Sequence, residues 1–229
     1  MRSILVALPL LLATPAAAQQ TDEQLWLQVN ASLAIGAREK VTLESIARFS
    51  DRADGFSHAE IAGLFTHTTR GGVELSFGYG HVEDWNRANR LPSEERLRQM
   101  VLVPLGSGFS GRLRLDERIN SGGSEIGVRL RPRLGFDTPI NAHGLRLFAT
   151  SEHFLNVNGT AWGQRGGYER MRNALGLSIP LGGRLRGAVG YLNQYRFGRD
   201  AGRDAGRDQM DHVATFTLSL NLARIGDGE

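Results

Sequence analysis

Residues 214–222 read Ala-Thr-Phe-Thr-Leu-Ser-Leu-Asn-Leu. Apolar and polar side chains alternate strictly along this stretch, which is the pattern of a β-strand with two unlike faces. The same alternation recurs in residues 25–35, 41–49, 58–66, 73–80, 96–103, 112–119, 125–131, 145–152, 174–179 and 185–191. No segment of the sequence carries an apolar stripe with helical spacing. The sequence therefore predicts an all-β fold.

The length of these runs favours a barrel that crosses a membrane. Most of them approach the roughly 9–11 residues that a tilted membrane-spanning strand needs, whereas strands of soluble proteins average roughly 5–6. Their polar face mixes charged residues with glycines such as Gly78, Gly80, Gly176 and Gly190. Glycine weakens a solvated strand, but inside a narrow barrel it leaves room for long side chains. We predict an antiparallel, transmembrane up-and-down β-barrel with the apolar face toward lipid.

The connections between the runs alternate between short and long. The short ones lie near residues 36–40, 70–72, 105–108 and 181–183, and the long ones at residues 50–57, 82–93, 156–169 and 198–208. Outer-membrane barrels have short periplasmic turns and long external loops, so we expect the long set outside the cell. Because bacterial single-chain barrels have even strand numbers, we expect ten or twelve strands, with a further strand near residues 156–168 or an irregular first run. An odd barrel with one parallel closure is the alternative, which gives a predicted range of 10–12 strands.

The first eighteen residues have the features of a cleaved secretory signal peptide. Met1-Arg2 supplies a positive start, residues 4–13 are mostly apolar, and Ala16-Ala17-Ala18 fits a cleavage site. The apolar run is shorter than the ~20 residues of a membrane-spanning helix. We therefore expect residues 1–18 to be removed and residues 19–229 to form a single outer-membrane barrel domain. The sequence has no Cys, which excludes disulfides and thiolate zinc sites.

Several short motifs are shared with one family of exported bacterial proteins. They are Asp22-Glu23-Gln24-Leu25-Trp26, Arg48, Gly78-Tyr79, Glu94-Glu95-Arg96, Arg112-Leu113-Arg114-Leu115-Asp116-Glu117-Arg118, Arg129-Leu130-Arg131, Glu152, Asn173 and Gly190-Tyr191-Leu192. In these motifs the chain resembles the domain-of-unknown-function 2490 (DUF2490) family. The resemblance covers nearly the whole chain after the signal peptide. It implies an outer-membrane-like barrel, and it implies no activity.

Alternation places most charged side chains of the runs on the polar, inward face. The arginines of this set are Arg48, Arg96, Arg98, Arg112, Arg114, Arg118, Arg129, Arg131, Arg146, Arg172 and Arg186. The acidic residues are Glu44, Glu60, Glu74, Asp116, Glu125 and Glu152. These charges would form either an arginine–carboxylate network that plugs the lumen or a narrow, positively lined pore that favours anions. The sequence leaves both possibilities open.

The function that follows is a structural or porin-like barrel in the outer membrane of a Gram-negative cell, without enzymatic activity. We expect outer-membrane lipid as a partner, and the barrel-assembly machinery during biogenesis. We expect no metal and no cofactor, because the six His residues have no chelating spacing. We expect no nucleic acid, because the arginines follow one strand face and no matching motif accompanies them. The transported or bound solute and the oligomeric state are not specified by the sequence.

Two other functions remain as alternatives. One is an outer-membrane hydrolase with an active site at the barrel rim, formed by Ser151-Glu152-His153, by Asp211-His212, or by His58 with Glu60. On a strand, however, Ser151 and Glu152 would point to opposite faces. The other is a soluble periplasmic barrel that binds a ligand in an apolar interior.

Overall fold

The computed structural model describes residues 20–198 and 208–222. The predicted signal peptide and most of the connection at residues 198–208 lie outside these ranges. The strands are β1 (Gln20–Ala34), β2 (Glu39–Ser50), β3 (Gly55–Thr68), β4 (Glu74–Asn86), β5 (Asn89–Arg90), β6 (Glu94–Gly106), β7 (Phe109–Asn120), β8 (Ile126–Pro139), β9 (Arg146–Asn156), β10 (Gly167–Gly182), β11 (Leu185–Arg196) and β12 (Gln209–Leu222). The part of the chain that the structure describes contains no helical segment that could span a membrane.

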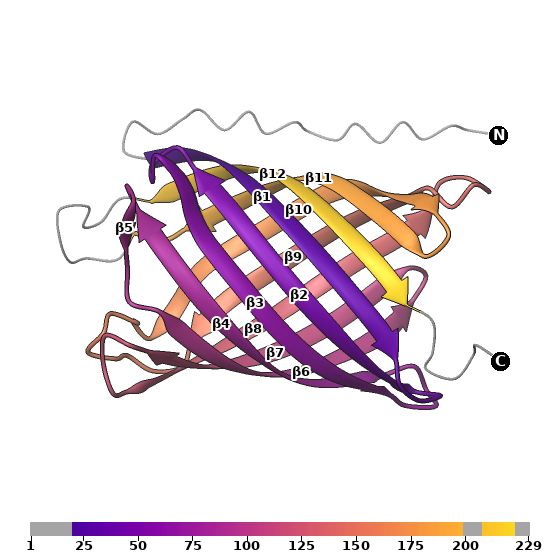
Figure 1. Cartoon of the computed structure of the whole chain (residues 1–229), viewed down its shortest axis with the longest axis horizontal. Helices are drawn as coiled ribbons and strands as arrows, with labels where there is room; N and C mark the ends of the chain where they lie inside the picture. Colours follow the sequence, from indigo (N-terminus) through magenta and orange to yellow (C-terminus); the bar gives the residue numbers. More distant parts are fainter. Residues whose placement is uncertain (1–19, 199–207, 223–229) are drawn as a thin grey trace, which may run out of the picture.

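Eleven of these strands close into a barrel (Figure 1). Neighbours in the chain pair antiparallel around the barrel, with β4 pairing directly with β6. The ring is closed by a parallel pair, β1 and β12, in which Gln20 lies opposite Gln209 and Leu33 opposite Leu222. The two-residue strand β5 pairs with β4 in a short hairpin and does not join the ring.

The all-β, up-and-down barrel predicted from the alternation is confirmed. Each of the eleven alternating runs lies largely within one strand of the ring. The ring has eleven strands, which lies within the predicted range of 10–12, but the expected even number of ten or twelve is wrong. The chain uses the odd alternative with one parallel closure. Residues 157–166, where a further strand was considered, connect β9 and β10 without forming one. A parallel ladder is compatible with the alternation because residues that lie opposite each other still share a face.

The two ends of the barrel differ in their connections. The turn end carries residues 35–38, 69–73, 107–108, 140–145 and 183–184, and the loop end carries residues 51–54, 87–93, 121–125 and 157–166. Within the described residues, the connections predicted to be short therefore lie at one end of the barrel, and those predicted to be long lie at the other end. Because the closure is parallel, β1 begins at the loop end and β12 finishes at the turn end (Figure 1).

Two turn-end hairpins are built alike, as their similar sequences suggested. The pairing register shifts between Pro104 and Gly106 in one, and between Pro180 and Gly182 in the other. Proline cannot donate to the strand ladder, so the ladder becomes irregular where it stands. Gly106 and Gly182 follow with φ of 86° and 110°, a region in which glycine is favoured.

The barrel places apolar side chains on its outside and polar side chains inside. Thirty-three large apolar side chains of the described chain are exposed, whereas its buried apolar residues number only six. The fifteen buried polar or charged residues include Arg98, Arg114, Asp116 and Glu152. The interior is therefore held by ion pairs and hydrogen bonds rather than by an apolar core.

Candidate functional site

Arg98 on β6 is fully buried and joins carboxylates from two other strands. Its guanidinium donates to Glu44 Oε2 on β2 at 3.1 Å and also to Glu60 on β3. Arg96 donates to Glu60 Oε2 at 2.8 Å. These bonds cross the inner face of β4 at Gly80, where a Cβ atom would lie 3.1 Å from Arg98 Nη2. The absence of a side chain at that position leaves the space that Arg98 needs.

A second charge network lies on β7, β8 and β9. Arg114 Nε donates to Asp116 Oδ1 at 2.5 Å, and Arg131 Nη1 donates to Asp116 Oδ2 at 3.3 Å. Arg131 Nη2 also donates to Glu152 Oε2 at 3.0 Å, and Arg112 donates to the same carboxylate. Asp116 is 1% exposed and Glu152 is 7% exposed. Each carboxylate is thus shared by two arginines, which stabilises cations that are removed from water.

At the loop end, the connection at residues 157–166 folds over the barrel mouth. Gln164 is buried, and its Oε1 accepts a hydrogen bond of 2.8 Å from Arg118 Nη1. Arg118 also donates to Glu94 Oε1 at 2.9 Å, and its Cζ lies 5.1 Å from the ring centroid of Trp162. Polar and aromatic residues of this connection therefore fix one side of the mouth.

The other loop-end contacts hold β9, β10 and the segment that leads into β12. Arg129 donates to Asn156 Oδ1 at 2.8 Å and to Glu169 Oε2 at 2.5 Å. Asp208, which precedes β12, accepts hydrogen bonds from the Tyr195 hydroxyl and, at 2.9 Å, from the Gly198 N–H. These two donors lower the pKa of the Asp208 carboxyl below its usual range, in that order of importance. The carboxylate therefore stays charged where the connection re-enters the barrel.

Aromatic rings hold the arginines of β2 and β10. Arg48 Cζ lies 3.9 Å from the centroid of the Trp26 ring, and Arg172 Cζ lies 4.7 Å from the same centroid. Arg172 also lies 4.5 Å from the centroid of Phe154, which is 2% exposed, and Arg131 lies 4.4 Å from it. Guanidinium groups bind to aromatic faces through cation–π attraction. Guanidinium groups and aromatic rings thus alternate from Arg48 through Trp26, Arg172 and Phe154 to Arg131. We call these five residues the arginine–aromatic row.

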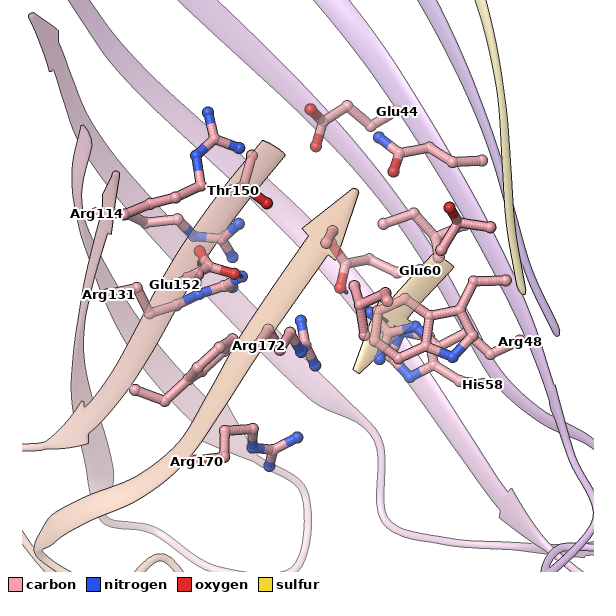
Figure 2. Close-up of a pocket in the computed structure, with 18 of the residues that line it drawn as sticks. Glu44, Arg48, His58, Glu60, Arg114, Arg131, Thr150, Glu152, Arg170 and Arg172 are labelled. Atoms are coloured by element: carbon pink, nitrogen blue, oxygen red, sulfur yellow. Dashed lines mark hydrogen bonds and ion pairs between the residues drawn. The ribbon is translucent and has the colours of Figure 1, made fainter. Parts of the chain in front are cut away.

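A cavity of about 610 Å³ lies between these networks. Eleven arginines line it, against the four carboxylates of Glu44, Glu60, Asp84 and Glu152. Figure 2 shows Arg114, Arg131, Glu152, Arg170 and Arg172 on one side of this space and Glu44, Arg48, His58 and Glu60 on the other. Carboxylates outside the lining, those of Glu94, Asp116, Glu169 and Asp211, pair with several of these arginines. The positive charge that remains unpaired makes the cavity a place where an anion would be stabilised.

Residues 23–205 match the family model described as a protein of unknown function (DUF2490). The chain belongs to the DUF2490 family. A protein of Methylorubrum extorquens, described as uncharacterised, is 35% identical to this DUF2490 chain over 152 residues. The match covers 63% of this chain and 62% of that protein, which is less than two thirds of the relative's length. No solved structure matches the chain. The family resemblance seen in the motifs is therefore confirmed.

The DUF2490 structure brings together most of the side chains that alternation placed on the inner face. Those in the charge networks, the loop-end contacts and the arginine–aromatic row are Arg48, Arg96, Arg98, Arg112, Arg114, Arg118, Arg129, Arg131, Arg172, Glu44, Glu60, Asp116 and Glu152. Three others lie at the turn end. There, Arg146 pairs with Asp137, Glu74 accepts from Lys40 Nζ at 2.9 Å, and Arg186 donates to Gly144 O at 3.1 Å.

Glu125 does not lie on an inner strand face as the prediction had it. Strand β8 begins one residue later, at Ile126, so Glu125 belongs to the connection at residues 121–125 and is exposed. Its carboxylate accepts a hydrogen bond from the Ala161 N–H of the connection over the mouth. The difference arises because the alternating pattern continues across the strand boundary, where the backbone leaves the sheet.

Several interior residues of this DUF2490 barrel were missed because its strands are longer than their alternating runs. Arg133, Arg170 and Arg196 line the cavity, and Glu94 and Glu169 pair with its arginines. Each lies on a strand segment beyond the end of the predicted run. Four of these residues lie near the loop end, where both faces of the strands carry polar residues and the hydropathy alternation is lost. Arg133 instead lies in the middle of β8, directly after Pro132. Counting every second position beyond each run would have found Glu94, Arg133, Arg170 and Arg196, but not Glu169, which lies at the register shift between Tyr168 and Arg170.

We expect Gly176→Ala to destabilise the barrel. A Cβ atom at Gly176 would lie 2.5 Å from Phe148 Cζ and 2.8 Å from Gly190 Cα, and it would also meet Val189 O. Overpacking of this kind costs about 1–3 kcal/mol. The temperature at which the folded band is lost on a denaturing gel measures the effect. The matched control is Gly63→Ala on β3, because nothing lies within 4 Å of a Cβ atom there; an equal effect of both changes would contradict close packing at Gly176.

In two of the three groups considered for a hydrolase, the acidic residue lies on the inner face of the barrel and its Ser or His neighbours lie on the outer face. Ser151 Oγ lies 3.5 Å from His153 Nε2, but Glu152 is buried on the opposite face of β9. His153 Nδ1 lies 2.6 Å from the hydroxyl of Tyr168 rather than beside a carboxylate. Asp211 is fully buried while His212 is exposed.

His58 differs, because it faces the cavity with Glu60. His58 Nδ1 lies 2.6 Å from Asp84 Oδ1, and His58 Nε2 lies 3.7 Å from Glu60 Oε2. Each imidazole nitrogen therefore has a carboxylate beside it. That the protein is not an enzyme stays a prediction.

Proposed function

We propose that this DUF2490 protein is an outer-membrane β-barrel whose narrow lumen admits small anions in preference to cations. The observation that supports this most directly is the cavity lining of eleven arginines and four carboxylates. A charged ring of arginines selects for anions in a pore. One charge network joins β2, β3 and β6, and the other joins β7, β8 and β9. Both occupy part of the lumen, which argues against a wide, non-selective channel. The proposal assigns the protein no catalytic step.

The outer surface supports the membrane part of the proposal. Leu43, Phe77, Leu113 and Leu175 are all at least half exposed on the outer face, although water would oppose their exposure. The strands of the ring have 11–16 residues, enough to cross a bilayer at a tilt. An apolar exterior of this kind is typical of the lipid-facing band of a membrane barrel.

Aromatic clusters near both ends are typical of the interfacial girdles of such barrels. At the turn end the ring centroids of Phe109 and Phe136 lie 4.9 Å apart. At the loop end the rings of Phe56 and Trp85 lie 4.8 Å apart. The shorter connections at the turn end favour an orientation with that end toward the periplasm.

The proposal is tested by cell fractionation followed by bilayer recording. We expect the protein in the outer-membrane fraction, with a gel mobility that changes on boiling. In a planar bilayer under a KCl gradient, we expect a small conductance with a reversal potential near that of chloride. Arg133→Glu should reduce this preference, because Arg133 lines the cavity. Arg38→Glu, an equal change of charge at an exposed turn residue, is the control.

Three outcomes would overturn parts of the proposal. A protein released with the soluble periplasm would show that the apolar exterior does not face lipid. A cation preference would contradict the role of the arginine lining. A membrane protein without any conductance would show that the charge networks close the lumen completely.

A further inference from the structure

Three arginines that line the cavity, Arg48, Arg133 and Arg172, have no ion-pair partner among the described carboxylates. Two of them, Arg48 and Arg172, lie over the ring of Trp26. No described Asp or Glu oxygen lies within ion-pairing distance of Arg48 or Arg172. The four carboxylates that line the cavity already have other partners, which are Arg96, Arg98, Arg112, Arg131 and His58. The Nε atom of Arg48 is buried and has no hydrogen-bond partner within the described chain. Cations that are partly removed from water and have no counter-charge are costly to a fold. The two guanidinium groups lie 3.9 Å and 4.7 Å from the centroid of the same Trp26 ring, and together they call for a compensating group.

The surrounding residues hold these two guanidinium groups in place without neutralising them. Both lie over the ring of Trp26, and Arg172 also lies over the ring of Phe154. Arg172 Nε donates to Gln194 Oε1 at 2.6 Å, and the amide nitrogen of Gln194 donates to Asp211. The Gln194 amide thus lies between the Asp211 carboxylate and the Arg172 guanidinium group. The remaining N–H groups of Arg172 have no partner in the described residues.

We propose that Arg48 and Arg172 form a saturable binding site for a small divalent oxyanion of the phosphate class, in the part of the lumen next to Trp26. This site rests on the proposed anion-preferring lumen and adds a defined ligand class to it. Two guanidinium forks match the oxygens of phosphate in geometry and in charge. Chloride, with one charge and no directional oxygens, would gain less from the same two forks. The cavity of about 610 Å³ is also large enough for a small phosphate ester.

Trp26 supplies a direct signal for the test. The sequence has three Trp residues, so a protein with Trp85→Phe and Trp162→Phe retains Trp26 as its only indole. We would titrate the folded barrel in detergent with inorganic phosphate, and separately with chloride, at matched ionic strength. We expect a saturable change in Trp26 emission with phosphate and a weaker, non-saturable change with chloride.

Variants identify the groups that bind. Arg172→Gln should weaken phosphate binding by about tenfold or more, which is the scale of a lost hydrogen bond between charged groups. The control is Arg186→Gln, which removes the same charge at the turn end, where Arg186 donates to Gly144 O. We expect Arg172→Gln to keep its boil-dependent gel mobility, because no carboxylate loses a partner. We also expect phosphate to raise the temperature at which the folded band of the unsubstituted barrel is lost, but not that of the Arg172→Gln variant.

The outcomes separate this inference from the proposed function. Equal responses to phosphate and chloride, or equal losses in Arg172→Gln and Arg186→Gln, would overturn the site and leave an anion preference in bilayers intact. A cation preference in bilayers with saturable phosphate binding would overturn the proposed pore and leave the site. An Arg172→Gln variant that no longer folds would show that Arg172 acts in stability, and would overturn the site if Arg48→Gln folds and binds phosphate normally.

Discussion

Replacing Leu175 by arginine is expected to prevent most of the protein from reaching its folded, boil-sensitive form in the outer membrane. Leu175 lies in the middle of β10 and is 55% exposed on the outer face, opposite Ala149 and Tyr191 on the neighbouring strands. If this face meets lipid, an arginine near the bilayer midplane costs about 2–4 kcal/mol. That is a large part of the stability of an ordinary domain.

The fraction of protein with boil-dependent gel mobility measures this effect in isolated outer membranes. Leu175→Met is the matched control, because it keeps an apolar side chain of similar volume. In a soluble barrel the same position would face water, where an arginine changes stability by about 0.5 kcal/mol or less. Normal folding of Leu175→Arg would therefore contradict the membrane barrel.

Replacing Glu152 by alanine should destabilise the barrel more than any change at its exposed ion pairs. Glu152 is buried and accepts from Arg131 at 3.0 Å and 3.2 Å, and from Arg112. Without it, Arg131 retains Asp116, while Arg112 has no carboxylate within the described residues. Breaking a buried ion pair from one side typically costs about 3–5 kcal/mol, because it leaves an uncompensated charge.

The shift in the temperature at which the folded band disappears gives the measurement. Glu74→Ala is the control, since its ion pair with Lys40 is partly exposed, with side-chain exposures of 31% and 39%. Exposed pairs of this kind contribute about 0–1 kcal/mol. If the two substitutions shifted the transition equally, the interior network would not stabilise the fold as we describe.

The alternation of residues such as those at 112–119 and 214–222 predicted which side chains share a face, because period two is a local property of a single strand. Arg98, Arg114 and Asp116 could therefore be assigned together from the sequence. Glu125 could not be placed in this way, because the end of a strand depends on whether the neighbouring backbone continues to pair with it.

The sequence could not predict which charged side chains pair with each other. Arg98 reaches Glu44 and Glu60 across β4, and Arg172 and Arg48 share the Trp26 ring from β10 and β2. Such contacts depend on the stagger between strands and on which strands face each other across the lumen. For the same reason the unpaired arginines could be counted only in the closed barrel.

The sequence by itself determined an all-β chain with one apolar and one charged strand face, and with short and long connections in alternation. Hydropathy along a strand is sufficient for those features. Only the tertiary structure decided that eleven strands close through the parallel pair β1 and β12, and that Arg48 and Arg172 lack carboxylates. Closure and charge pairing join residues far apart in the chain, and their energies depend on barrel geometry that no local pattern contains.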